Sequence, residues 1–242
     1  HDLANVVPMP RIVLLVDEVG ALSPEVSDSF FNTLRTVFTQ GRGASRELSK
    51  YLFIFSGAVD LYALTFGSNS PLNICEKVYL SDFGLQDVRG IVRHFDRMGV
   101  SVEKGVPDLL YDLVGGHPYL TMRACALMQQ SGPDKVTPDL VHMAVDKLLL
   151  EDDNIRHVIR ELENHPLERE RLREILIEER ELAFSRNDLV LASLEMIGAV
   201  RPDQPCRVRN RLYERALCQY YEGRNSGMEL GELFSEQHTA DD

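Results

Sequence analysis

The chain has 242 residues, enough for one large domain or two to three small ones, and its composition of 44% hydrophobic and 26% charged residues is ordinary for a globular protein. Its formal net charge of −12 argues against a general affinity for nucleic acid or anionic membranes, because both depend on clustered Lys and Arg. No apolar run approaches transmembrane length and no signal-peptide pattern opens the chain, so a membrane span and secretion are not expected.

The cysteines and histidines are dispersed along the chain. The four cysteines form no CxxC pair, and the seven histidines show no HExxH or paired spacing. This pattern favours a reduced, cytoplasmic protein over a disulfide framework or a zinc site. We therefore expect no metal bound by a cluster of such side chains.

An unbroken apolar run ends in two adjacent carboxylates, Asp17 and Glu18. The run from Arg11 to Val16 is typical of a strand buried on both faces in a parallel sheet. Acids at the carboxyl end of such a strand lie at the edge where open α/β sheets bind ligands. In phosphate-hydrolysing ATPases, the acid of a Walker B strand holds Mg²⁺. A core strand followed by an acidic turn is the alternative.

A helix and a second strand follow the acidic pair. Ser23 and Pro24 have the residue types of a helix start, apolar residues recur at helical spacing up to Phe38, and Gly41 is expected to end the helix. Residues 51–57 then predict a second buried strand, and two parallel strands joined by a helix form a βαβ unit. The hydroxyl of Ser56 would lie beside Asp17, where it could sense a terminal phosphate. The simpler interpretation is a serine that ends a strand.

No phosphate-binding loop of the form GxxxxGK[ST] occurs in the sequence. The glycine-rich segment 41–45 lacks the lysine and is read as a loop. A chain that begins at His1 without an initiator Met is expected to be part of a longer protein. If Asp17 and Glu18 serve a nucleotide, the loop is expected before His1.

The pattern becomes helical after Asp82. A short helix is predicted over 60–66 and a short third strand over 76–80. Helices are then predicted over 85–98, 107–114, 118–130 and 138–150. Between the second and third of these, Gly115 and Gly116 free the backbone for a left-handed turn, and Pro118 opens the next helix. His117 lies within this turn. The helix start suits an anion or a polar base edge, whereas the alternative is a common joint between two helices.

The last part of the chain has the element order of a winged helix. Amphipathic patterns predict three helices, with the third capped by 185–188 and ended by Gly198, followed by a hairpin over 200–208 and a helix over 210–221. The third helix has no Lys or Arg, so DNA reading is not expected of it. A cluster of arginines over 207–215 is explained equally by a solvated face or an acidic partner. Residues 225–242 are expected to be a disordered acidic tail.

Three of these signals, in this order, resemble the AAA-like domain of bacterial signal-transduction ATPases, within the STAND and archaeal-type P-loop ATPases. They are the segments 13–19, 53–57 and 114–120. The resemblance spans about residues 11–220. It implies that Asp17 is the Mg²⁺-associated acid, that Glu18 activates water and that Ser56 is the sensor. It also implies that Gly115, Gly116 and His117 shape a lid turn and that Pro118 approaches the adenine of ATP.

The sequence thus predicts an α/β fold: a partial P-loop NTPase parallel sheet (1–82), a helical lid (83–150), a winged-helix domain (151–224) and a tail (225–242). The expected function is a signalling switch that binds and slowly hydrolyses ATP with Mg²⁺ and repositions the lid and winged helix for a protein partner or effector domain. A nucleotide-dependent homo-oligomer is compatible with this role. The alternatives are a catalytically inactive scaffold, a winged-helix DNA-binding regulator and an unrelated α/β enzyme.

Overall fold

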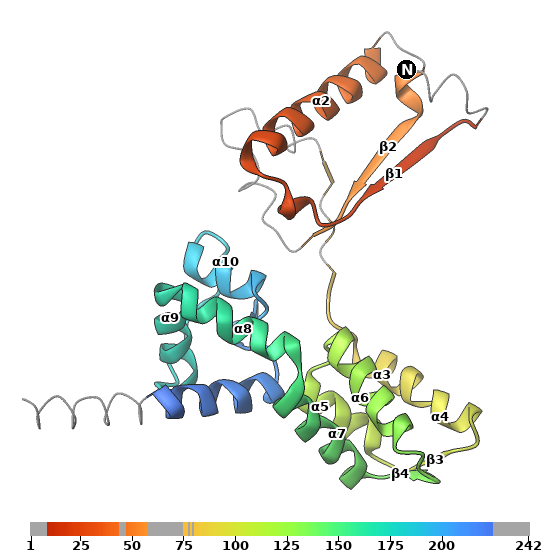
Figure 1. Cartoon of the computed structure of the whole chain (residues 1–242), viewed down its shortest axis with the longest axis vertical. Coiled ribbons are helices and arrows are strands. Elements are labelled where there is room, and N and C mark those ends of the chain that lie inside the picture. The colour runs from red at the N-terminus through yellow and green to blue at the C-terminus, as the bar shows by residue number, and fades with distance from the viewer. Residues whose placement is uncertain (1–8, 44–46, 58–74, 77, 79, 225–242) are drawn as a thin grey trace, which may run out of the picture. The chain divides into compact units, whose positions relative to one another are not determined.

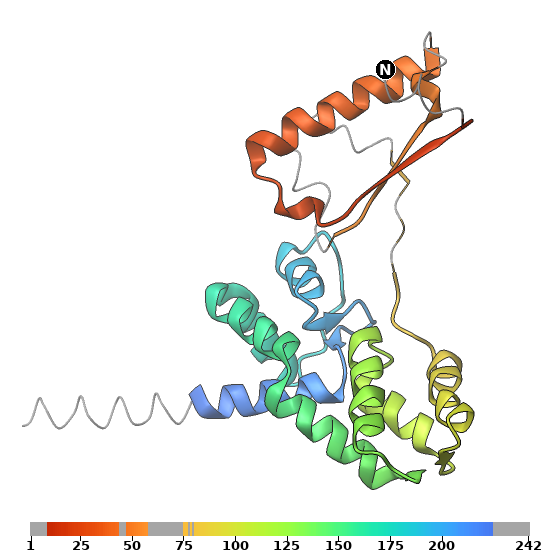
Figure 2. The same ribbon diagram turned by 45° about the vertical axis from the view of Figure 1, so that its right-hand side comes forward.

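The computed structural model describes residues 9–43, 47–57, 75–76, 78 and 80–224. The chain divides into two compact units, residues 1–79 and residues 80–242. We call them unit 1 and unit 2 and describe each by itself. Figures 1 and 2 show that unit 1 contains a small parallel sheet with a long helix, whereas the described part of unit 2 is almost entirely helical. The chain is therefore an α/β protein with mostly helical content.

Unit 1 is built on a parallel strand pair, as predicted. Strand β1 (Ile12–Val16) pairs with β2 (Tyr51–Phe55), and Leu14 lies opposite Phe53 in the register. Helix α2 (Pro24–Gly43) connects them, with short 3₁₀ turns η1 (Val19–Ala21) and η2 (Leu48–Lys50) at the ends of the connection. The aromatic rings of Phe30, Phe31 and Phe55 meet edge to face, and they form the centre of a small core between the helix and the sheet.

The prediction that the first strand is buried on both faces is wrong for the described structure. Leu15 is 75% exposed, and Leu52 and Ile54 on the neighbouring strand are each 46% exposed. The register places Leu15 opposite Ile54, so these side chains share one face of the sheet. Helix α2 packs on one face of this two-stranded sheet, and among the described residues the side chains of the other face remain partly or largely exposed. Parallel sheets are normally covered on both faces.

Two other predictions in unit 1 need correction. Gly41 does not end the helix, which continues to Gly43. A Cβ on Gly41 would lie 3.0 Å from the backbone carbon and oxygen of Leu48, so the glycine permits the returning chain to approach the helix closely. Residues 76, 78 and 80 are not in a strand, while the predicted helix over 60–66 and positions 77 and 79 lie outside the described residues.

The first half of unit 2 contains the helices predicted after Asp82. The expected helix over 85–98 is divided at Arg93 into two pieces. Two parallel strands of two residues each, β3 (Ser101–Val102) and β4 (Lys135–Val136), were not predicted. The helices are α3 (Leu85–Val92), α4 (His94–Arg97), α5 (Val106–Val114), α6 (Pro118–Gln130) and α7 (Pro138–Glu151).

The second half of unit 2 has three helices, a hairpin and a last helical stretch. The helices are α8 (Asp153–Asn164), α9 (Pro166–Leu176) and α10 (Leu189–Met196). Strands β5 (Val200–Arg201) and β6 (Arg207–Val208) pair antiparallel as the predicted hairpin, and residues 211–224 are helical. One continuous buried cluster extends through both halves, from Val88 to Leu217. Among the described residues, no helix combines the length and apolar character needed to cross a membrane.

Candidate functional site

The acidic pair and Ser56 meet at the carboxyl ends of the two parallel strands. The Ser56 hydroxyl donates to Oδ1 of Asp17 at 2.5 Å, and the backbone N–H of Glu18 donates to the same oxygen at 2.9 Å. The backbone N–H of Ser56 donates to the Val16 carbonyl at 3.0 Å, which continues the strand pairing by one residue. The structure thus brings Asp17 and Ser56 together as the sequence predicts.

The hydrogen bonds at this edge favour an ionised Asp17. The Ser56 hydroxyl, and next the Glu18 amide, hold the pKa of the Asp17 carboxyl below its usual value, although the group is exposed to solvent. Glu18 has backbone angles φ 52° and ψ 43°, in the left-handed region that few residues other than glycine adopt. Gly57 on the facing strand end lies close by, since a Cβ there would be 3.3 Å from the Val19 nitrogen. The acids therefore occupy a tight, sharply turned strand end.

The donor chemistry at Asp17 suits part of a magnesium site. Mg²⁺ prefers oxygen ligands and is usually held through one or two carboxylates together with substrate phosphates and water. Oδ1 of Asp17 is occupied by two hydrogen bonds, which fix the carboxylate in place. The described residues include no group of three or more His, Cys, Asp or Glu that could hold a metal ion without further ligands. Asp17 therefore fits a Mg²⁺ held jointly with a nucleotide, and not a dedicated protein cage.

The glycine turn of unit 2 is locked by a close approach to Phe83. Gly115 and Gly116 have φ values of 63° and 72°, as predicted for a left-handed turn. The Phe83 amide donates to the Gly116 carbonyl at 2.8 Å, and a Cβ on Gly116 would be only 2.0 Å from the Phe83 oxygen. Only glycine fits at this position. The conformation of the turn is therefore fixed by the backbone of Phe83, near the start of unit 2, as well as by the ends of α5 and α6.

His117 and Pro118 begin α6 on this turn. The Nδ1 atom of His117 accepts from the Leu120 amide at 3.5 Å and caps the helix, with Pro118 in its first turn. Burial, followed by the charge of Arg209, lowers the pKa of His117 to about 4. The imidazole is therefore neutral near pH 7. Its ring stacks against Tyr213 with centroids 6.2 Å apart.

The residues that surround the turn were not predicted as site residues. Asp82 accepts from Nη2 of Arg209 at 2.8 Å, across 127 positions of sequence. Asn210 lies so close to Gly115 that a Cβ on the glycine would be 2.9 Å from the Asn210 Cβ. The sequence did contain a signal for Arg209, because the arginines over 207–215 form a cluster that an acidic partner could explain. In the structure, Arg209, Arg211 and Arg215 of this cluster pair with acids of the first half of unit 2.

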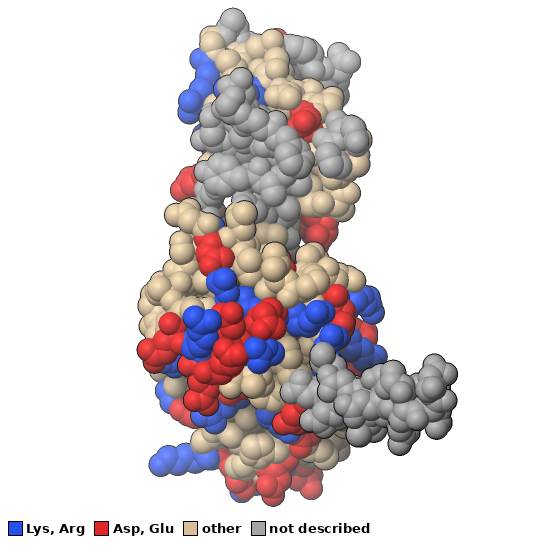
Figure 3. Space-filling model, turned by 90° about the vertical axis from the view of Figure 1, so that its left-hand side faces the viewer, with Lys and Arg blue, Asp and Glu red and all other residues tan. Residues whose placement is uncertain are grey.

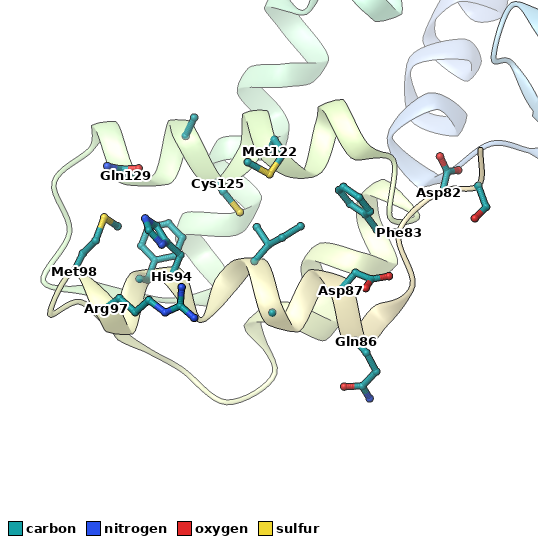
Figure 4. A pocket seen from close by; sticks show the side chains of 15 residues that line it. Asp82, Phe83, Gln86, Asp87, His94, Arg97, Met98, Met122, Cys125 and Gln129 are labelled. Carbon is teal, nitrogen blue, oxygen red and sulfur yellow. The ribbon is translucent and has the colours of Figure 1, made fainter. Parts of the chain in front are cut away.

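A groove of ≈ 900 Å³ lies between α6 and the helices α3 and α4. Figure 4 shows Met122 and Cys125 of α6 facing the other two helices, with Met98 and Gln129 towards one end and Phe83 towards the other. Burial raises the pKa of the Cys125 thiol to about 11, so the thiol is neutral and unreactive near pH 7. The groove reaches Asp82 and Phe83, and its Phe83 end therefore borders the glycine turn.

Comparison with known proteins gives the family. A family model described as the AAA-like domain matches residues 5–219. The chain belongs to this family. No curated protein matches it.

Solved structures similar to this AAA-like domain include several of RuvB from Thermotoga maritima. One single-residue variant of RuvB is 16% identical with a TM-score of 0.45, and a second is 15% identical with a TM-score of 0.44; each match covers 88% of this chain and 72% of the other. A third RuvB structure, titled a Holliday junction branch migration motor, is 14% identical over the same shares with a TM-score of 0.43. Likenesses at this level support no argument about function.

Within this AAA-like domain, the predicted site residues fall into two places. Asp17, Glu18 and Ser56 belong to unit 1, while Gly115, Gly116, His117 and Pro118 belong to unit 2. The structure gives each group a defined local geometry, the hydrogen bonds at Asp17 and the left-handed turn at Gly115 and Gly116. The roles themselves enter the proposal below.

Proposed function

We propose that this AAA-like domain is the larger part of a STAND-like ATPase module that acts as a nucleotide-dependent signalling switch in the cytoplasm. The observation that carries the proposal is the hydrogen-bonded arrangement of Asp17 and Ser56 at the carboxyl ends of two adjacent parallel strands. In open α/β sheets this edge is where ligands bind. Membership of the AAA-like family supports ATP as the ligand.

Each residue at the strand ends has a distinct task in this proposal. Asp17, kept ionised by Ser56 and the Glu18 amide, would hold Mg²⁺ through its remaining oxygen or through water. Glu18 would orient the attacking water, and Ser56 would respond to the terminal phosphate. Bound Mg²⁺ would neutralise charge on the phosphates. A phosphate-binding loop would come from residues outside this sequence, because the sequence has no GxxxxGK[ST] segment.

Unit 2 would supply the lid and the output surface. We assign residues 83–150 to the lid, with the turn from Gly115 to Pro118 at the adenine, and residues 151–224 to a winged helix. The order of α8, α9, α10 and the β5–β6 hairpin supports this assignment. A switch also requires two states with different affinity for ATP. The nucleotide would set the position of unit 2 and thereby open or close a partner surface.

A protein partner fits unit 2 better than nucleic acid. Helix α10 carries no Lys or Arg, although the third helix of a DNA-reading winged helix presents such side chains to base edges. On the face drawn in Figure 3, Lys and Arg are interspersed with Asp and Glu over the described part of unit 2. Ion pairs of unit 2 such as Arg171–Asp188 at 2.8 Å and Arg173–Glu170 at 2.8 Å likewise bring opposite charges together. That face has no extended field of one sign for phosphate backbones.

The test uses the complete parent protein with a Glu18→Gln substitution. We expect ATP to bind with Mg²⁺ and to turn over at least about tenfold more slowly, because the amide cannot accept a proton from water. Glu151→Gln is the matched control, since Glu151 is exposed at the end of α7. Unchanged turnover in the Glu18 variant would remove Glu18 from this role.

The same protein separates the switch from a scaffold. If the switch is correct, ATP should change hydrogen exchange in α5, α6 and α10 relative to ADP. A parent protein that binds no ATP at all would leave the inactive scaffold as the better description. Salt-dependent DNA binding by the parent would instead favour the DNA-binding regulator.

A further inference from the structure

The arginine cluster near the end of unit 2 forms three ion pairs with the first half of the same unit. Arg209 pairs with Asp82 at 2.8 Å, Arg211 with Asp112 at 2.6 Å and Arg215 with Asp146 at 2.8 Å. These acids lie before α3, on α5 and on α7 respectively. The two halves of unit 2 are therefore joined along the start of the helical stretch 211–224.

The first of these pairs adjoins the glycine turn. Asp82 directly precedes Phe83, whose amide donates to the Gly116 carbonyl. Arg209 directly precedes Asn210, which packs against Gly115. Tyr213, one turn further along, stacks on His117. The Arg209–Asp82 pair thus ties together the two chain segments that enclose residues 115–117.

The environment of the pair makes it sensitive to substitution. The side chains of Arg209 and Asp82 are 25% and 21% exposed, against 44% and 55% for Arg215 and Asp146. The buried Nε of Arg209 has no hydrogen-bond partner among the described residues, so Asp82 supplies the compensation for the guanidinium charge. Breaking a pair that is largely shielded from water leaves one charge without a partner and costs more than breaking an exposed pair, which contributes little.

We propose that Arg209, held by Asp82, is a positioning residue for the turn from Gly115 to Pro118. Through Arg209, the second half of unit 2 would control how this turn recognises the nucleoside part of ATP. This inference rests on the proposed function, which places the turn at the adenine. Arg209 acts through the backbone of Phe83 and Gly116 and through Asn210 and Tyr213. A displacement of the helical stretch 211–224 would change the geometry of the turn, and binding of a base would in turn restrain that stretch.

The test compares two ligands that differ in the nucleoside. Affinities of the complete parent protein are measured for ATP and for inorganic tripolyphosphate, which carries phosphates but no base or ribose. We expect Arg209→Gln to weaken ATP binding by about tenfold, within the usual range of coupling between sites. Tripolyphosphate binding should stay unchanged, because the phosphates would be held elsewhere. Asp82→Asn should reproduce this split.

Two controls isolate positioning from general loss of structure. Arg215→Gln removes an exposed ion pair between the same two halves, and Arg207→Gln removes an exposed arginine next to the pair. Neither should alter the ratio of the two affinities. Arg209→Lys keeps the charge but not the planar geometry, so we expect a smaller loss for ATP. If Arg209→Gln fails to fold, the affinities for ATP and tripolyphosphate can be compared in Arg209→Lys instead. They can also be compared in the double variant Asp82→Arg with Arg209→Asp, in which the two charges are exchanged.

The outcomes separate this inference from the function on which it rests. Equal losses for both ligands, or no loss for either, in a folded Arg209 variant would overturn the positioning role while ATP binding by the wild type stands. A wild-type parent that binds neither ligand would overturn the proposed function and the inference with it. A selective loss for ATP that is smaller in the lysine variant supports the proposal.

Discussion

The close approach at Gly116 gives a quantitative test of the turn. In Gly116→Ala, a residue with a side chain must adopt φ 72°, which costs about 1–2 kcal/mol. The new Cβ would also lie 2.0 Å from the Phe83 oxygen, so the backbone of Phe83 must move and its 2.8 Å hydrogen bond to Gly116 is weakened or lost. That bond contributes about 1 kcal/mol. We expect a total loss of roughly 3 kcal/mol in the free energy of unfolding, a large fraction of domain stability.

Gly132 offers a matched control for the backbone term. It has φ 61°, and an added Cβ would have no atom within 4 Å. Gly132→Ala should therefore lose only the cost of the left-handed conformation, about 1–2 kcal/mol in the free energy of unfolding. Urea unfolding of the two variants and the wild type measures the difference through the midpoint. Equal losses at the two positions would show that contact with Phe83 does not stabilise the turn.

Three further predictions concern other residues. As the pH falls from 6.5 towards 4, His117 is protonated in the unfolded chain before it is protonated in the folded protein, so the free energy of unfolding should fall by up to about 3 kcal/mol. This pH-dependent loss should be missing in His117→Asn. Chemical unfolding at several pH values measures both. Asp188→Ala should lower the free energy of unfolding by about 1–2 kcal/mol, because Asp188 caps α10 by accepting from two backbone amides. Asp188→Asn should retain most of this capping. Equal losses in the two variants would argue against a capping role. Ser56→Ala should raise the pKa of Asp17 in a carboxyl NMR titration, whereas Thr36→Ala should not, and an unaltered Asp17 pKa would contradict the observed hydrogen bond.

The sequence pattern was sufficient to predict helices and their starts where nearby residues determine the structure. The starts of α6 and α7 coincide with Pro118 and Pro138, because proline in the first turn fixes the backbone without losing a helical hydrogen bond. The strands β3 and β4 were missed because two residues are too few to show an alternation.

The remaining errors and omissions depend on contacts between distant residues. Gly41 resembles a helix stop, but its role comes from the backbone of Leu48, which the sequence cannot place. The pairing of Asp82 with Arg209 spans 127 positions and depends on how the two halves of unit 2 fold together. The relevant residue types were visible in the sequence, whereas their partners were not.

The exposed face of the β1–β2 sheet bears on how the acidic pair would become a complete site. Unit 2 has a continuous buried cluster, whereas the described residues of unit 1 give a cluster with only Val19 and Phe31 fully buried. Leu15, Leu52 and Ile54 leave apolar area exposed that would be stabilising if covered, at about 25 cal/mol for each Å². A further strand pairing parallel to β2 would end beside Ser56. In the proposed function, a phosphate-binding loop would complete the nucleotide site at this same edge of the sheet, where Asp17 and Ser56 already meet.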